Sequence, residues 1–173
     1  MLAKAVFVLF FLMGASAYAC VQLESEYCCG YSLGDIYSCG EQISVKQTPI
    51  EGGYKFEFTG NGFLQGVFLA DGKPYQVDNG LISGEAVTTC SDTGMVMSID
   101  KAKMENDGTV AYGYYRFGFS TYGYNDGSFN KVEDCSFTMP DGTPAATSCG
   151  GGGGIYWESC MPKSKIPPPK PRG

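Results

Sequence analysis

Short runs in which apolar and polar residues alternate dominate the chain downstream of its first twenty residues. From Tyr54 to Thr59 three aromatic residues alternate with three polar ones, and the segments 95–100 and 110–115 show the same period of two. A period of two places successive side chains on opposite faces of a β-strand. Beyond residue 19, no segment carries an apolar stripe of 3.6-residue period long enough to predict a helix. The pattern therefore predicts an antiparallel all-β protein.

Turn signals separate these runs and divide the chain into strands of ordinary length. Asn-Gly or Asp-Gly pairs begin at Asn61, Asp71, Asn79, Asp107, Asp126 and Asp141. Such pairs favour the primed turns of β-hairpins, because Asn, Asp and Gly tolerate positive backbone φ angles. We expect strands near 41–48, 53–59, 63–70, 74–78, 82–90, 94–100, 109–119 and 128–138. Frequent turns between short strands are typical of an antiparallel β-sandwich or barrel.

The first nineteen residues read as an export signal. Lys4 precedes an uninterrupted apolar run, and small residues then offer cleavage after Ala17 or after Ala19. The apolar run is shorter than the roughly 20 residues that a membrane-spanning helix needs. We therefore expect residues 1–19 to be a signal peptide and the mature chain to be secreted, without membrane insertion.

The C-terminal residues 161–173 differ in composition from the rest. They are basic and contain the run Ile166–Pro171, which favours polyproline II and predicts a disordered tail. Residues 20–160 then form a single domain, because about 140 residues suffice for one core.

Cysteine usage sharpens the compartment prediction. The eight cysteines are Cys20, Cys28, Cys29, Cys39, Cys90, Cys135, Cys149 and Cys160, and the chain has no histidine. An even number of cysteines in an exported chain predicts disulfides, whereas their spacing and the lack of histidine argue against a metal site. We expect Cys28 and Cys29 to bond to different partners, and residues 20–39 to form a loop fastened onto the sheets. The sequence leaves the connectivity open.

Catalytic chemistry finds little support. Without histidine, Ser-His-Asp and Cys-His arrangements are excluded, and no context marks a Ser-Lys or carboxylate pair. The acidic turns 105–108 and 124–128 lack the ligand spacing of a calcium-binding EF-hand. We therefore predict no catalytic residues, no cofactor and no metal.

Charge constrains the partners. The net charge of −6 becomes about −11 for the body once the signal and the basic tail are set aside. A body this acidic repels nucleic acid, so the expected partner is an extracellular protein or a glycan.

Residues 112–124 contain seven aromatic side chains and are the best functional hint. On a strand, Tyr115, Phe117 and Phe119 share one face, and Tyr112 and Tyr114 share the other. These side chains either pack a core or expose an aromatic row that could stack on a sugar ring or a protein surface. The candidate binding residues are Tyr112, Tyr114, Tyr115, Phe117, Tyr122, Tyr124 and Trp157. Trp157 follows the glycine run 150–154 and either docks onto the body or meets a partner.

Together these features predict a secreted, non-enzymatic, disulfide-rich β protein that serves as a structural or binding component of an extracellular matrix or surface. A secreted effector or toxin-like protein and a carbohydrate-binding module remain the alternatives.

Overall fold

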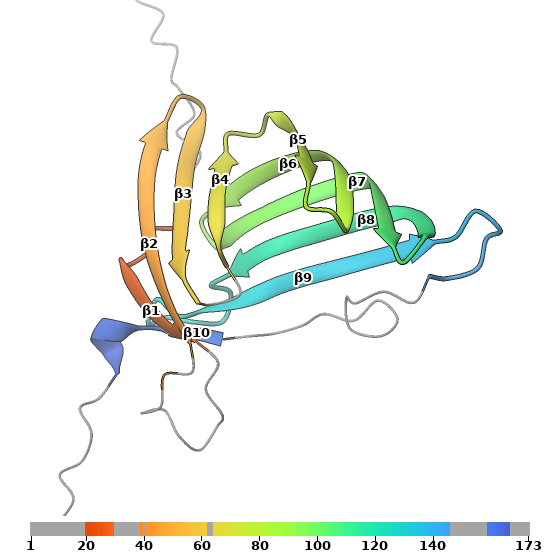
Figure 1. Ribbon diagram of the computed structural model, residues 1–173. Coiled ribbons are helices and arrows are strands. Elements are labelled where there is room, and N and C mark those ends of the chain that lie inside the picture. Colours follow the sequence, from red (N-terminus) through yellow and green to blue (C-terminus); the bar gives the residue numbers. More distant parts are fainter. Residues whose placement is uncertain (1–19, 30–38, 40, 62–63, 146–158, 167–173) are drawn as a thin grey trace, which may run out of the picture.

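The computed structural model describes residues 20–29, 39, 41–61, 64–145 and 159–166 (Figure 1). The elements are β1 (Glu26–Cys29), β2 (Glu41–Ile50), β3 (Gly53–Gly60), β4 (Gly66–Ala70), β5 (Pro74–Asp78), β6 (Ile82–Ser91), β7 (Gly94–Asn106), β8 (Thr109–Ser120), β9 (Phe129–Thr138), β10 (Ser159–Pro162) and a 3-10 turn, η1 (Lys163–Lys165). Within these ranges, no helix has the length and hydropathy required to cross a bilayer.

The ten strands of the described ranges belong to one antiparallel sheet. Their order is β4-β3-β2-β1-β10-β9-β8-β7-β6-β5, so the edge strands β4 and β5 are consecutive in the chain. The sheet bends strongly: β2–β4 rise on one side of Figure 1 and β5–β9 on the other, and β1 and β10 lie between them. The N–H of Gly72, in the turn that joins β4 to β5, donates to the carbonyl of Thr88 on β6 at 3.1 Å. This bond brings the two ends of the sheet together.

The all-β antiparallel class is confirmed, and the eight predicted strands correspond to β2–β9. Strand β7 runs six residues beyond its predicted end. An irregularity between Ile99 and Ala102 shifts its register against β8, which breaks the alternation that the sequence prediction followed.

The prediction of a loop over residues 20–39 is wrong for Glu26–Cys29, which form β1 inside the sheet, paired with both β2 and β10. A strand of four residues with two cysteines is too short to show an alternating pattern. The predicted start of the tail, at residue 161, falls inside β10, which ends at Pro162. The predicted signal, residues 1–19, and residues 167–173 of the tail lie outside the described ranges.

Two of the Asx-Gly turns show how the strands are connected. Asp107 and Gly108 have φ angles of 48° and 77° and close the β7–β8 hairpin, as their residue types predict. Asp71-Gly72 connects strands that do not pair with each other, so this turn is not a hairpin.

The core lies on the concave face of the bent sheet. Phe56 and Phe58 on β3 contact Phe119 on β8 across the fold, with ring centroids 6.0 and 5.9 Å apart. Further ring contacts extend this cluster to Tyr27 and Tyr115. The aromatic chain is Tyr27, Phe129, Phe119, Phe56, Phe58, Tyr54, Phe68, Phe117 and Tyr115. Each fully buried apolar side chain of this size stabilises the fold by about 1.5–3 kcal/mol.

Disulfides fasten the N-terminal part of the sheet. The bridges between described residues are Cys20–Cys90, Cys28–Cys39 and Cys29–Cys160. The expectation that Cys28 and Cys29 have different partners is confirmed. Cys135 is also disulfide-bonded, and Cys149 lies outside the described ranges. Such bridges indicate an oxidising environment.

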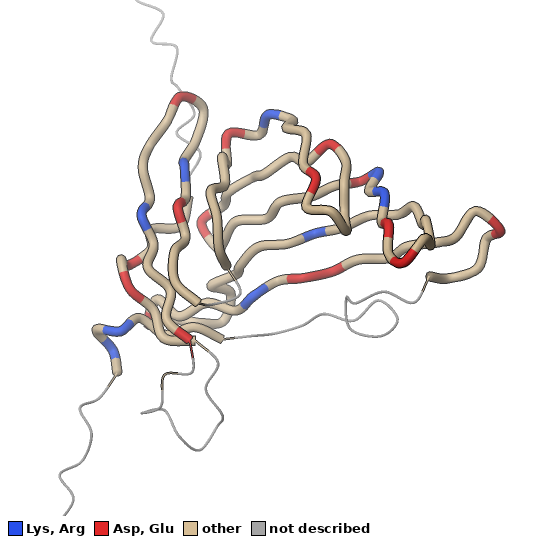
Figure 2. The backbone as a smooth tube through the Cα atoms, viewed as in Figure 1, with Lys and Arg blue, Asp and Glu red and all other residues tan. Residues whose placement is uncertain are grey.

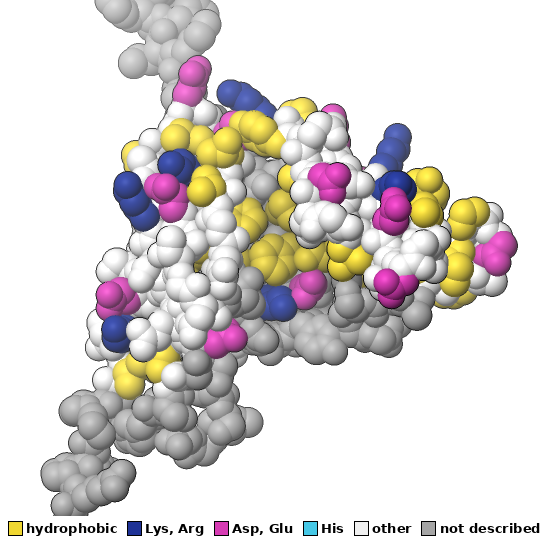
Figure 3. All heavy atoms as spheres, in the orientation of Figure 1, with side chains coloured by type: hydrophobic (Ala, Val, Ile, Leu, Met, Phe, Trp, Pro, Cys, Tyr) yellow, Lys and Arg dark blue, Asp and Glu magenta, His cyan; other side chains and the backbone are white. Residues whose placement is uncertain are grey.

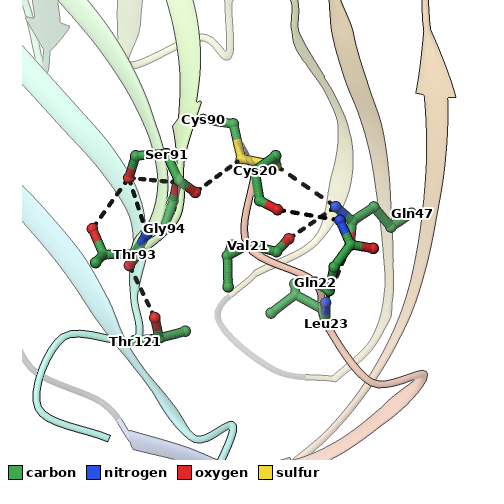
Figure 4. Close-up of a disulfide and its surroundings, with 10 residues drawn as sticks. All are labelled: Cys20, Val21, Gln22, Leu23, Gln47, Cys90, Ser91, Thr93, Gly94 and Thr121. Atoms are coloured by element: carbon green, nitrogen blue, oxygen red, sulfur yellow. Dashed lines mark hydrogen bonds between the residues drawn. A yellow bond between two sulfur atoms is a disulfide. The ribbon is translucent and has the colours of Figure 1, made fainter. Parts of the chain in front are cut away.

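The Cys20–Cys90 bridge joins the segment that precedes β1 to strand β6 (Figure 4). Next to it, the N–H of Val21 donates to the carbonyl of Ser91 at the end of β6, at 2.7 Å. The side-chain amide of Gln47 on β2 donates to the carbonyl of Val21 at 2.9 Å. The segment that precedes β1 is thereby tied to β2 and to β6 at once.

Candidate functional site

A cleft opens on the concave face between the two edges of the sheet. One hollow of about 350 Å³ lies under β5 and includes Val77, Met97, Ile99 and Tyr115 in its lining. A second, of about 340 Å³, lies between β4 and β5–β6 and shares Val77 and Met97 with the first. We call the two together the concave cleft. Figure 3 shows hydrophobic side chains at the bottom of a hollow between the two arms of the sheet.

Strands β7 and β8 supply the floor of this cleft. Met97 is paired with Phe117 and Ile99 with Tyr115, so the alternation of both strands turns these side chains to the concave face. The Tyr115 and Phe117 rings are nearly parallel, with centroids 6.3 Å apart, and Phe117 stacks in turn on Phe68 of β4 at 6.2 Å. The floor therefore continues the aromatic core toward the surface.

A charged pair lies on the same concave face. Lys131 and Glu133 of β9 form an ion pair of 3.0 Å, with side chains only 15% and 19% exposed. The Tyr115 phenol donates to Glu133 Oε1 at 2.9 Å. Burial raises the pKa of Tyr115, and the neighbouring Glu133 carboxylate raises it further, so this phenol stays protonated and acts as a donor. Figure 2 shows the basic and acidic positions side by side along β9.

Sequence reasoning missed Lys131 and Glu133, although a signal was present. From Phe129 to Phe137 the side chains at odd positions of β9 face the core. Both charged residues stand at odd positions, among otherwise apolar side chains. Charged side chains on the core-facing side of a strand indicate a polar group that is buried with a partner.

The structure divides the aromatic candidates between different surfaces. Tyr115 lines the concave cleft and Phe117 packs beside it, whereas Tyr112 is 56% exposed on the opposite face of β8. Tyr114, also on that outer face, donates to Asp134 at 3.2 Å, and the Arg116 guanidinium lies 5.4 Å from the centre of its ring.

The remaining candidates lie after β8. Tyr122 is 81% exposed, and Tyr124 donates to the Asn130 side chain at 2.9 Å. Trp157 lies outside the described residues. The candidates therefore do not form one aromatic surface.

The glycines of β8 have a structural explanation. A Cβ on Gly113 would collide with the Ser136 carbonyl oxygen of β9, and one on Gly118 with the Met95 carbonyl oxygen of β7. Both glycines permit close approach of the neighbouring strands.

Over the ranges that the structure describes, no three acidic or cysteine side chains converge in a way that could hold a metal ion. Comparison of the chain with protein-family models, curated proteins and solved structures found no match.

Proposed function

We propose that this chain is a secreted, non-enzymatic binding component that works outside the cell, and that the concave cleft receives its ligand. The single observation that carries the proposal is the cleft itself, a mostly apolar hollow with a polar group, Tyr115–Glu133–Lys131, on the same face. Concave apolar surfaces with a few fixed polar groups are the usual form of ligand sites in proteins.

Binding without turnover fits the state of the polar group. The Glu133 carboxylate pairs with Lys131 and accepts the Tyr115 hydrogen bond, so neighbours engage it on both sides. Burial raises the pKa of the Tyr115 phenol, so it keeps its proton at neutral pH and does not act as a base. The group is suited to hold a ligand and not to transfer a proton.

An extracellular matrix or surface is the setting that we propose. Disulfides that tie the N-terminal segment, β1, β6 and β10 together make the fold resistant to unfolding outside the cell. The tyrosines of β8 are divided between the two faces of the sheet and do not form the aromatic row that a carbohydrate-binding module uses. This division favours the cleft as the ligand site. Enrichment of the native protein in an insoluble extracellular extract would support the matrix setting.

The binding site is tested with a neutral probe, N-phenyl-1-naphthylamine, whose fluorescence rises in apolar surroundings. Met97→Lys places a charge on the cleft floor. Val96→Lys, at the preceding residue of β7, places a charge on the outer face. We expect Met97→Lys to abolish probe fluorescence and Val96→Lys to retain it, with both variants checked for folding by circular dichroism. Equal probe binding by wild type and a folded Met97→Lys protein would overturn the assignment of the site.

A further inference from the structure

We propose that the free edge of β5 binds an extended peptide as an additional strand, whose alternate side chains enter the concave cleft. This inference rests on the proposed function, since it names the class of ligand that the cleft receives. Its basis is the backbone geometry at the seam between β4 and β5.

The two edges of the sheet flank the cleft. Within the described ranges, β4 pairs only with β3 and β5 only with β6. Side chains of both edge strands line the same hollow, Val67, Phe68 and Leu69 from β4 and Tyr75 and Val77 from β5. A strand added to β5 would lie in this seam and bring the sheet closer to a closed barrel.

The β5–β6 hairpin determines which backbone groups of β5 point into the seam. The N–H of Asn79 donates to the carbonyl of Ile82, so these residues close the hairpin as a hydrogen-bonded pair. Hydrogen-bonded pairs alternate along an antiparallel ladder, which makes Val77–Gly84 and Tyr75–Ala86 the next two. The N–H and C=O groups of Gln76 and Asp78 therefore point to the free edge.

Pro74 agrees with this assignment. By the same alternation its backbone nitrogen is turned to the free edge, where the absence of an N–H costs no bond to β6. The first residue of the strand is thus blocked as a donor, and Gln76 supplies the central N–H of the edge.

The β4 edge lacks the devices that usually protect exposed strands. Its sequence, Gly-Val-Phe-Leu-Ala, contains no charge and no proline, and Val67 is 60% exposed. Edges of this kind invite pairing with another strand. Because the β4–β5 turn is bonded to β6, the open part of the seam lies along β5, over Met97 and Tyr115.

An extended peptide is the ligand class that matches both features. Its alternating N–H and C=O groups complement Gln76 and Asp78, while every second side chain points to the apolar floor. A small apolar molecule would fill the floor but would leave the edge without a partner. The whole chain has a net charge of −6, and this negative charge favours a peptide with basic flanks.

The probe is the synthetic peptide acetyl-Lys-Thr-Val-Thr-Val-Thr-Lys-amide, titrated against the full chain by isothermal calorimetry. In the proposed pairing the threonines lie opposite Gln76 and Asp78 and the valines face the cleft. A second peptide, methylated on the threonine nitrogens, keeps the side chains but cannot donate to the edge. We expect the methylated peptide to lose binding, because each lost hydrogen bond weakens affinity by up to about tenfold.

On the protein side, Gln76→Pro removes one outward N–H without breaking a bond to β6, and Gln76→Thr retains that N–H. We expect Gln76→Pro to weaken the peptide about tenfold and Gln76→Thr to leave it unchanged. Equal binding of both peptides, or no effect of Gln76→Pro, would overturn the edge pairing.

Two other outcomes separate this inference from the proposed function. Binding of N-phenyl-1-naphthylamine without binding of the peptide would overturn the peptide assignment and leave the cleft as the site. If neither probe binds, both proposals fail. If the chain self-associates and Gln76→Pro abolishes that association, the edge binds a second copy of the chain. This result would overturn the assignment of the edge to a peptide from another protein.

Discussion

The phenol of Tyr115 on β8 donates a 2.9 Å hydrogen bond to the carboxylate of Glu133 on β9, on the concave face of the sheet. Register places Tyr115 opposite Cys135 and Glu133 opposite Phe117, so the bond runs diagonally between neighbouring strands. It connects the exposed end of the aromatic chain to the only carboxylate that the described part of β9 turns to that face. The pair therefore lies where the aromatic core meets the proposed ligand site.

Tyr115 makes the stability of the fold sensitive to alkaline pH. Its pKa in the folded protein lies above the value of about 10 for an unfolded chain. Stability from a group with a raised pKa is complete below the unfolded value, and it is lost as pH rises through the folded value. We expect the free energy of unfolding to fall above pH 10, by at most about 1.4 kcal/mol per pH unit for this residue.

Urea unfolding at pH 8, 9, 10 and 11 measures this effect. Tyr115→Phe should have a shallower alkaline decline than the wild type. Part of the decline should remain in the variant, because burial also raises the pKa of Tyr27. Identical pH profiles for the two proteins would contradict the assigned role of Tyr115.

The ion pair on the concave face should stabilise the fold more than a comparable pair on the outside. Glu133→Gln removes the carboxylate beside Lys131, whose side chain is only 15% exposed, and we expect a loss of about 1–3 kcal/mol. Glu105→Gln is the matched control, because the side chains of Glu105 and its partner Lys103 are 57% and 42% exposed, and such pairs contribute about 0–1 kcal/mol. Chemical denaturation of both variants at pH 7 makes the comparison, and an equal cost would show that the concave pair has no special role.

Periodicity was sufficient to predict most of the sheet, because β2–β9 each have enough residues to show alternation. It failed for β1 and β10, where four residues give no period and the strands exist only because long-range pairing and disulfides hold them in the sheet. Strand order was also out of reach, since β1 and β10 are neighbours although more than 130 residues separate Cys29 from Cys160.

The candidate site was predictable in part. Alternation assigned Tyr115 and Phe117 to one face, but the choice between core and exposed row depends on the bend that brings β3 against β8. Lys131 and Glu133 could have been identified from the sequence, because they are charged residues at strand positions that are otherwise apolar. Their position beside Tyr115 could not, because it depends on the β8–β9 register.

Gly118 should be intolerant of a methyl group. Its Cα faces the Met95 carbonyl oxygen of β7, so the Cβ of alanine would collide with backbone and not with a side chain that could move. We expect Gly118→Ala to cost about 1–3 kcal/mol, the range seen when extra atoms are forced into a packed interior. Ser98→Ala on β7 is the control, since it adds no atoms to the same sheet. A Gly118→Ala protein as stable as the wild type in urea would contradict the close approach.

The Cys20–Cys90 bridge should contribute more stability than the Cys28–Cys39 bridge. The first closes a loop of 70 residues and the second a loop of 11, and the chain-entropy relation makes the difference about 1.5 kcal/mol. We expect the paired alanine substitution of Cys20 and Cys90 to cost about 2–4 kcal/mol in urea unfolding. Loss of this bridge also releases the segment that it holds against Ser91 and Gln47, so hydrogen exchange at the Val21 and Leu23 amides should accelerate. The paired alanine substitution of Cys28 and Cys39 should leave those two amides protected. Equal protection of Val21 in both double variants would show that the Cys20–Cys90 bridge does not fasten this segment to β6.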